Sequence, residues 1–128
     1  MMITNSQEAP VVLLVEDEPL VRMSAADDLQ EAGFHVLEAA NADVALAVLE
    51  ACSSEVKVLF TDIDMPGSMN GLALAESVQR RWPHISLLIS SAYRRPHLGQ
   101  LPEDGRFLPK PYCGDAVVQH IRELMTHH

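Results

Sequence analysis

Three short apolar runs, each followed by charged residues, limit what this chain can fold into. The runs and the charges after them are Val11–Val15 with Glu16 and Asp17, Val56–Thr61 with Asp62, and Phe107–Pro109 with Lys110. Apolar runs of strand length are typical of strands that are buried on both faces of a parallel sheet. Because ligands bind outside the carboxyl ends of such strands, we expect three carboxylates and one ammonium to meet in a single crevice. Those groups could hold a divalent metal beside a phosphoryl group.

The size and composition of the chain favour a single domain. The chain has 128 residues, of which 48% are hydrophobic, enough for a core of ordinary size. Its longest apolar stretches are too short to cross a membrane, and no apolar signal segment follows a charged start. The two cysteines, Cys52 and Cys113, form neither a metal-binding spacing nor a disulfide framework. We therefore expect a cytoplasmic protein without a membrane partner.

The charge of the chain argues against nucleic-acid binding. Nine basic and eighteen acidic residues give a formal net charge of -9. Such a surface repels phosphate backbones, and the basic residues form only small groups such as Arg80-Arg81 and Arg94-Arg95. We expect no direct contact with DNA or RNA.

Strand and helix patterns alternate along the chain. Apolar runs predict strands at Val11–Val15, Val36–Leu37, Val56–Thr61, Ile85–Ser90 and Phe107–Pro109. Helical spacing predicts a helix from Pro19 to Gly33, one after an N-cap at Asn41, one over Gly71–Arg81, and one over Ala116–Leu124. The alternation implies right-handed crossovers and helices on both faces of one sheet. We therefore expect an α/β domain over residues 11–126, doubly wound in the flavodoxin-like order 2-1-3-4-5, after a flexible arm at residues 1–10.

Two local features refine this prediction. In the second helix, Val44, Ala45, Val48 and Leu49 have the spacing of a face that packs on the core. Between the fourth and fifth strands, Tyr93–Arg106 is rich in proline and glycine, which forbid a long helix. We expect a loop with about one helical turn there.

The predicted strand order brings complementary groups together. Strands one and three would be neighbours about 4.8 Å apart, so that Asp17 and Asp62 could share one ion. Crowded carboxylates raise one another's pKa, and a hard cation such as Mg²⁺ removes that conflict. Lys110 offers a positive charge to one phosphate oxygen, and the Ser91 hydroxyl could bond another. Asp62 lies centrally and is the natural nucleophile.

Four segments of the chain resemble the response-regulator receiver domains of bacterial two-component signalling. They are Val-Glu-Asp-Glu-Pro at 15–19, Thr-Asp-Ile-Asp-Met-Pro at 61–66, Ser91-Ala92 and Lys110-Pro111. Each motif alone is weak, but four in this order, each at a strand end, are highly specific. The resemblance runs from Val11 to about Met125 and is to a single-domain receiver like the chemotaxis regulator.

The resemblance implies an acidic metal site. Asp62 would accept a phosphoryl group from the phosphohistidine of a kinase. Asp17, Asp62 and the backbone carbonyl of Asp64 would bind Mg²⁺, with Glu16 acting through water. Glu18 is interpreted as a charge that favours the start of the first helix, and that simpler role is the alternative for Glu16 and Asp17.

The resemblance also implies a switch. Lys110 would pair with the phosphate, and the Lys110–Pro111 peptide bond is usually cis in the family. Ser91 would supply the switch hydroxyl, with Ser90 expected on the opposite side of the strand, and Phe107 would be the aromatic whose rotamer follows the switch. The Asp64 side chain and Tyr93 border the phosphate and could tune its hydrolysis.

The chain departs from the family pattern in three ways. The loop Gly67–Asn70 is one residue longer than usual, which a surface loop tolerates. The segment after Ser91 implies a reduced fourth helix, and so a changed output surface. Since no effector domain follows, the signal would pass to a separate protein partner, unless the chain is a fragment of a longer protein.

The leading hypothesis is a signalling switch that is phosphorylated on Asp62 in a Mg²⁺-dependent reaction. A histidine kinase or phosphotransfer protein would be the donor, and the chain would catalyse only its own phosphotransfer and dephosphorylation. The alternatives are a phosphate sink or the receiver of a hybrid histidine kinase. Asp62-Ile63-Asp64 also resembles the Asp-x-Asp pair of haloacid-dehalogenase-like phosphatases, although that pair follows the first strand there. A scaffold that is never phosphorylated is a further hypothesis. The sequence does not identify the kinase, the output partner, the phosphate lifetime or the oligomeric state.

Overall fold

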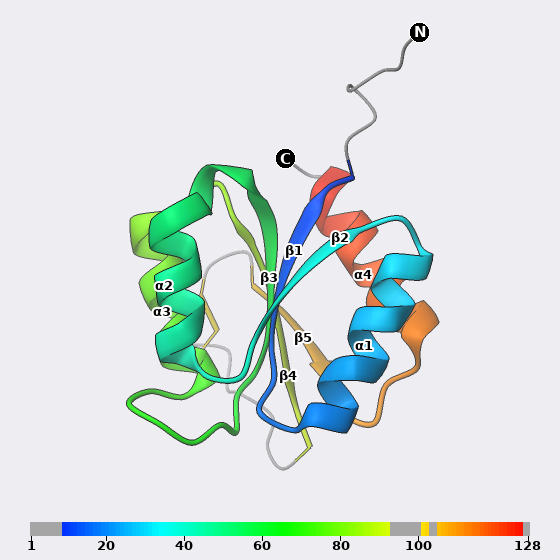
Figure 1. Ribbon diagram of the computed structural model, residues 1–128, viewed down its shortest axis with the longest axis horizontal. Helices are drawn as coiled ribbons and strands as arrows, with labels where there is room; N and C mark the ends of the chain where they lie inside the picture. Colours follow the sequence, from blue (N-terminus) through cyan, green and yellow to red (C-terminus); the bar gives the residue numbers. More distant parts are fainter. Residues whose placement is uncertain (1–8, 93–100, 103–104, 127–128) are drawn as a thin grey trace, which may run out of the picture.

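The chain forms a five-stranded parallel sheet with helices on both faces (Figure 1). The computed structural model describes residues 9–92, 101–102 and 105–126. The strands are β1 (Val11–Val15), β2 (His35–Ala39), β3 (Val56–Asp62), β4 (Ser86–Ser91) and β5 (Arg106–Pro109). All neighbouring strands are parallel, and their order is β2-β1-β3-β4-β5. The predicted α/β class and strand order are confirmed.

The helices form two layers around the sheet. They are α1 (Pro19–Glu31), α2 (Ala42–Cys52), α3 (Gly71–Arg81) and α4 (Gly114–Thr126), and a short 3-10 helix, η2 (Ser53–Glu55), precedes β3. Figure 1 shows α2 and α3 together on one face and α1 and α4 together on the other. Among the described helices, none has both the length and the apolar character needed to cross a membrane.

Each face of the sheet has its own apolar core. Leu13 and Val15 of β1 belong to the core beneath α2 and α3, whereas Val12 and Leu14 belong to the core beneath α1 and α4. This division follows from the strand geometry, in which successive side chains point to opposite faces. Because both faces of the central strands are buried, their sequences are continuous apolar runs.

Asparagine side chains begin two of the helices. The Asn41 side chain accepts a hydrogen bond from the Val44 N–H at 2.9 Å, and the Asn70 side chain accepts one from the Ala73 N–H at 2.9 Å. Each bond satisfies a first-turn donor that has no partner within its helix. The predicted cap at Asn41 is confirmed.

The buried stripe of α2 lies one position away from part of the predicted face. The helix buries Ala42, Ala45 and Leu49, whereas Val44 is 43% exposed. The prediction that Val44 packs on the core is therefore wrong. Ala45 and Leu49 are four residues apart and define the inward direction, and a residue one position before Ala45 turns about 100° away from it.

The edge strand β2 differs in length from its prediction, and the prediction for the segment before β5 lies largely outside the described residues. β2 is longer than the predicted Val36–Leu37, because an edge strand also tolerates exposed residues such as His35 and Glu38. The predicted loop and reduced fourth helix at Tyr93–Arg106 fall largely on residues 93–100 and 103–104, which lie outside the described residues. Residues 1–8 of the predicted arm also lie outside them.

Gly71 lets α3 begin directly against the end of β3. Its N–H donates to the Ile63 carbonyl at 3.0 Å. A Cβ at this position would lie 2.0 Å from the carbonyl oxygen of Asp62, which is far inside van der Waals contact. Because those atoms are buried backbone, only glycine fits without a shift of β3 or α3. The backbone of Asp62 is thus positioned partly by the missing side chain at Gly71.

We expect Gly71→Ala to lower the free energy of unfolding by more than about 2 kcal/mol, because the new methyl group overlaps backbone atoms of a buried strand. Gly33→Ala is the control, since Gly33 has φ +98 but nothing within 4 Å of an added Cβ. Gly33→Ala should lower the free energy of unfolding by about 1 kcal/mol, because alanine is strained in the left-handed conformation. Urea denaturation measures both values. Equal losses of stability in the two variants would show that the backbone shifts to accept a methyl group at position 71, and would contradict this explanation.

Candidate functional site

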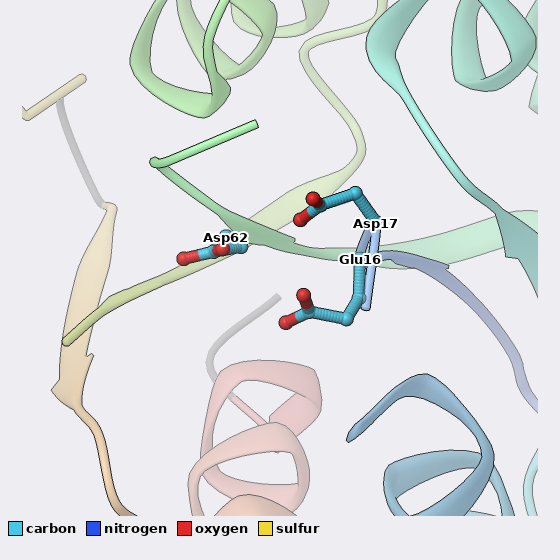
Figure 2. Close-up of side chains that lie close together, drawn as sticks. All are labelled: Glu16, Asp17 and Asp62. Carbon is cyan, nitrogen blue, oxygen red and sulfur yellow. The ribbon is translucent and has the colours of Figure 1, made fainter. Parts of the chain in front are cut away.

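Three carboxylates meet where β1 and β3 end. Val15 of β1 pairs with Thr61 of β3, so the residues that follow, Glu16 and Asp62, lie side by side at the ends of the two strands. Glu16, Asp17 and Asp62 each offer a carboxylate oxygen, and these oxygens all lie within 4.8 Å of one another (Figure 2). Glu16 is 3% exposed and Asp62 is 6% exposed. The structure therefore gathers the acidic residues that the sequence analysis singled out at β1 and β3.

Lys110 supplies the positive charge of the site. Its Nζ lies 2.7 Å from Oε1 of Glu16 and 3.4 Å from Oδ2 of Asp62. The Lys110 N–H donates to the Ser91 carbonyl at 3.0 Å, which fixes the end of β5 against β4. The Lys110–Pro111 peptide bond is cis, as the family resemblance implied. The ammonium thus faces the acceptor candidate and one of its acidic neighbours.

Burial and charge oppose each other at Asp62. Burial raises the pKa of this carboxyl from its ordinary 3.8 to about 6, and the charge of Glu16 raises it further, against the lowering effects of Lys110 and of a backbone hydrogen bond from Asp64. Burial works against the Lys110 ammonium, but its hydrogen bond to Glu16 and the charges of Asp62 and Glu16 leave the pKa of Lys110 raised. Burial is thus the main cause of the raised pKa of Asp62, and Lys110 offsets it only in part.

The acidic cluster fits a hard divalent cation. Its donors are carboxylate oxygens, which Mg²⁺ prefers. Oδ1 of Asp62 is a buried oxygen without a hydrogen-bond partner among the described residues, which is costly unless a further group binds it. A cation between Asp17 and Asp62 would supply both a partner for that oxygen and the missing positive charge.

Ser91 and Asp64 lie together beside the acidic cluster. The Ser91 hydroxyl, at the end of β4, donates to Oδ2 of Asp64 at 2.5 Å. Ser90 is fully buried, and its hydroxyl has no hydrogen-bond partner among the described residues. The two serines thus have different surroundings, and only the Ser91 hydroxyl is bonded to Asp64, which lies just after β3.

The other predicted site residues have less direct positions. Phe107, on β5, is partly buried and packs against the core beneath α2 and α3. Its switch role stays a prediction. Tyr93, which was expected to border the phosphate, lies outside the described residues.

Two residues near the site were missed by sequence reasoning. Arg22, on α1, donates from Nη1 to the Glu16 carbonyl at 2.7 Å and from Nε to Glu38 at 3.2 Å, which holds the turn after β1. The Tyr112 ring packs on Phe60 at 5.6 Å between centroids, and burial raises the pKa of Tyr112 to about 12. The available signals were weak: a basic residue soon after an acidic pair, and an aromatic soon after a lysine.

The electrostatics of Asp62 predict how stability depends on pH without metal. Since the folded state holds this proton more tightly than the unfolded chain, the protonated group stabilises the fold below about pH 3.8, and this stability is lost as the pH rises through about 6. One pKa unit corresponds to about 1.4 kcal/mol. At neutral pH the ionisation of Asp62 therefore lowers the free energy of unfolding by roughly 3 kcal/mol.

We expect Asp62→Asn, which resembles the protonated acid, to be more stable than the unchanged protein by about 3 kcal/mol at neutral pH and by almost nothing near pH 3.5. Urea denaturation with a metal chelator measures this difference, and the exposed Asp27→Asn should show no such gap. An Asp62→Asn protein that is less stable at neutral pH would contradict this electrostatic account.

Comparison with known sequences identifies relatives. Residues 12–122 match the family described as "Response regulator receiver domain". The "Sensor kinase CckA" of Brucella abortus (strain 2308) is 34% identical over 125 residues, which cover 95% of this chain and 13% of that protein. The "C4-dicarboxylate transport transcriptional regulatory protein DctD" of Rhizobium meliloti (strain 1021) is 34% identical over 117 residues, 89% of this chain and 25% of that protein. The chain thus spans a minor part of the length of these relatives.

Solved structures share the fold. A response regulator receiver domain protein from Clostridium thermocellum superposes with a TM-score of 0.84 at 19% identity, covering 91% of this chain and 94% of that chain. The receiver domain of "Hybrid Histidine Kinase CckA" gives a TM-score of 0.77 at 29% identity, covering 90% of this chain and 98% of that chain. By sequence match and by fold, this chain belongs to the response-regulator receiver domains of two-component signalling.

Proposed function

We propose that Asp62 accepts a phosphoryl group in a Mg²⁺-dependent reaction and that this modification switches the protein. One observation carries the proposal. The buried Asp62 carboxylate has oxygens of two further acids within 4.8 Å, and the Lys110 Nζ lies 3.4 Å from it. An acyl phosphate on Asp62 would have both the acidic cluster, which could hold a cation, and the Lys110 ammonium close by, and these positive charges suit a phosphoryl group in transfer.

The transfer is a displacement at phosphorus. A carboxylate oxygen of Asp62 attacks the phosphorus of a phosphohistidine, an O–P bond forms, and the N–P bond breaks with its electron pair left on the imidazole nitrogen. Water later attacks the same phosphorus, and the O–P bond breaks. This hydrolysis returns the Asp62 carboxylate and releases inorganic phosphate, which keeps both hydrogens of the water.

Each site residue has a proposed part in this chemistry. Asp17 and Asp62, with the Asp64 carbonyl, would hold Mg²⁺, and Glu16 would act through water. When bound, Mg²⁺ would supply positive charge next to the phosphoryl oxygens. Lys110 would leave its contact with Glu16 to pair with a phosphoryl oxygen.

We further propose that the phosphorylated state is read out at β4 and β5. Ser91 would donate its hydroxyl proton to a phosphoryl oxygen, and Phe107 would change its rotamer in response. Phosphorylation would thereby bias two conformations of this surface, and a separate protein would recognise one of them. We place the receiver domain at residues 11–126, after an arm at 1–10.

The phosphodonor is proposed to be a histidine kinase or a phosphotransfer protein. A second reading, the receiver of a hybrid histidine kinase or a phosphate sink, is favoured by the similarity to "Sensor kinase CckA" and to the receiver domain of "Hybrid Histidine Kinase CckA". The similarity to the regulatory protein DctD favours the first. A phosphatase using Asp62 and Asp64 is disfavoured because the Asp64 carboxylate is engaged by Ser91.

We expect acetyl phosphate with Mg²⁺ to add one phosphoryl group to the protein, and Asp62→Asn to abolish this addition because the acceptor oxygen is lost. Intact-mass measurement with both proteins side by side checks this. Asp43→Asn is a matched control, since it removes one charge at an exposed carboxylate and should label normally. Labelling that persists in Asp62→Asn refutes the site, and steady phosphate-ester turnover beyond one equivalent would revive the phosphatase.

We expect Mg²⁺ alone to raise the melting temperature of the protein, because it binds the folded cluster and not the unfolded chain. Asp17→Asn should weaken Mg²⁺ affinity by about tenfold or more, since a charged ligand is lost. Glu18→Gln removes a neighbouring exposed charge and should change the affinity by no more than about twofold. Calorimetric titration measures the Mg²⁺ affinity of the unchanged protein and of both variants. Equal losses of affinity in the two variants would indicate a diffuse charge effect instead of a site.

A further inference from the structure

In this structure the Ser91 hydroxyl forms a hydrogen bond to a side chain at the border of the site. It donates to Oδ2 of Asp64 at 2.5 Å. Ser91 is 3% exposed, so bulk water does not compete for this hydroxyl. A hydrogen bond from a hydroxyl to an ionised carboxylate is among the stronger ones in proteins. This bond therefore holds the Ser91 side chain firmly in its present orientation.

The backbone around Ser91 is fixed on both sides. The Ser90 carbonyl accepts the Ile63 N–H at 2.8 Å, and the Ser91 carbonyl accepts the Lys110 N–H at 3.0 Å. These bonds join β4 to its neighbours β3 and β5. A change at Ser91 would therefore be mainly a rotation of its side chain, which decides where the hydroxyl points.

Asp64 connects the acceptor and the serine. Its backbone forms a hydrogen bond to the Asp62 carboxylate, while its own carboxylate accepts the Ser91 hydroxyl. Its carboxylate does not belong to the cluster that Glu16, Asp17 and Asp62 form. The Asp64 side chain therefore has a position and a partner of its own at the border of the site.

We infer that the Asp64 carboxylate is the off-state acceptor of the Ser91 hydroxyl and opposes its engagement with a phosphoryl group on Asp62. A serine hydroxyl has one proton and donates to one acceptor at a time. Donation to a phosphoryl oxygen therefore requires that the bond to Asp64 breaks. This makes Asp64 a positioning residue that sets the balance between two orientations of Ser91.

The inference rests on the proposed function, since it concerns the same phosphoryl site. The probe is the phosphoryl mimic BeF₃⁻ with Mg²⁺, and the readout is its affinity by calorimetric titration. Asp64→Asn weakens the acceptor and Asp64→Ala removes it. We expect both to bind BeF₃⁻ at least about tenfold more tightly than the unchanged protein, because a charge-assisted bond no longer opposes binding. Two substitutions guard against one that fails to fold.

A double-mutant cycle separates this effect from simple charge repulsion. In a Ser91→Ala background the hydroxyl is absent, so Asp64→Asn should change BeF₃⁻ affinity by less than about threefold. A control is Asp43→Asn, because Asp43 also accepts a serine hydroxyl, from Ser68 at 2.7 Å, at an exposed site. It should change the affinity by no more than about twofold.

The outcomes distinguish the two proposals. An unchanged protein that binds no BeF₃⁻ in the presence of Mg²⁺ contradicts the proposed function itself. BeF₃⁻ binding that Asp64→Asn and Asp64→Ala fail to tighten overturns the role of Asp64 and leaves the acceptor assignment intact. Equal tightening with and without the Ser91 hydroxyl also overturns it, because repulsion by the Asp64 charge then accounts for the whole effect.

Discussion

The burial of neighbouring carboxylates at the ends of two adjacent strands is the constraint on which this site depends. Glu16, Asp17 and Asp62 bring their oxygens within 4.8 Å of one another in a largely buried place. Lys110 contacts two of them and compensates only part of the charge. The fold therefore carries a destabilised acid whose pKa is raised to about 6. A divalent cation would relieve this conflict and would also offset the negative charge of a phosphoryl group on Asp62.

The rest of the fold explains why the conflict persists. Two apolar cores bury both faces of β1 and β3, so their carboxyl ends cannot move apart without unpacking the sheet. Gly71 allows α3 to approach the backbone of Asp62 closely, and Arg22 links the Glu16 carbonyl to α1 by a hydrogen bond. Rigid elements thus hold the charged groups in place, which is what pre-organised binding of a charged ligand requires.

Much of this arrangement could be predicted from the sequence because it follows from backbone rules. Uninterrupted apolar runs indicated doubly buried strands, and alternation with helices indicated the order that places Asp62 beside Glu16. Side-chain partnerships over long sequence distances were less accessible. The donation from Ser91 to Asp64 depends on rotamers, and the contact of Arg22 with Glu16 follows no motif. Val44 was misplaced because periodicity gives a face only to within about one residue.

The similarities are to a sensor kinase and to a transcriptional regulatory protein, and the proposed chemistry at Asp62 does not depend on which setting applies to this chain. The most direct test is to treat the acetyl phosphate-labelled protein with borohydride, which reduces an aspartyl phosphate to homoserine, and to locate that residue by peptide mass spectrometry. Our account predicts homoserine at position 62 and at no other carboxylate. Homoserine at another acidic residue, with position 62 still aspartate, would contradict it.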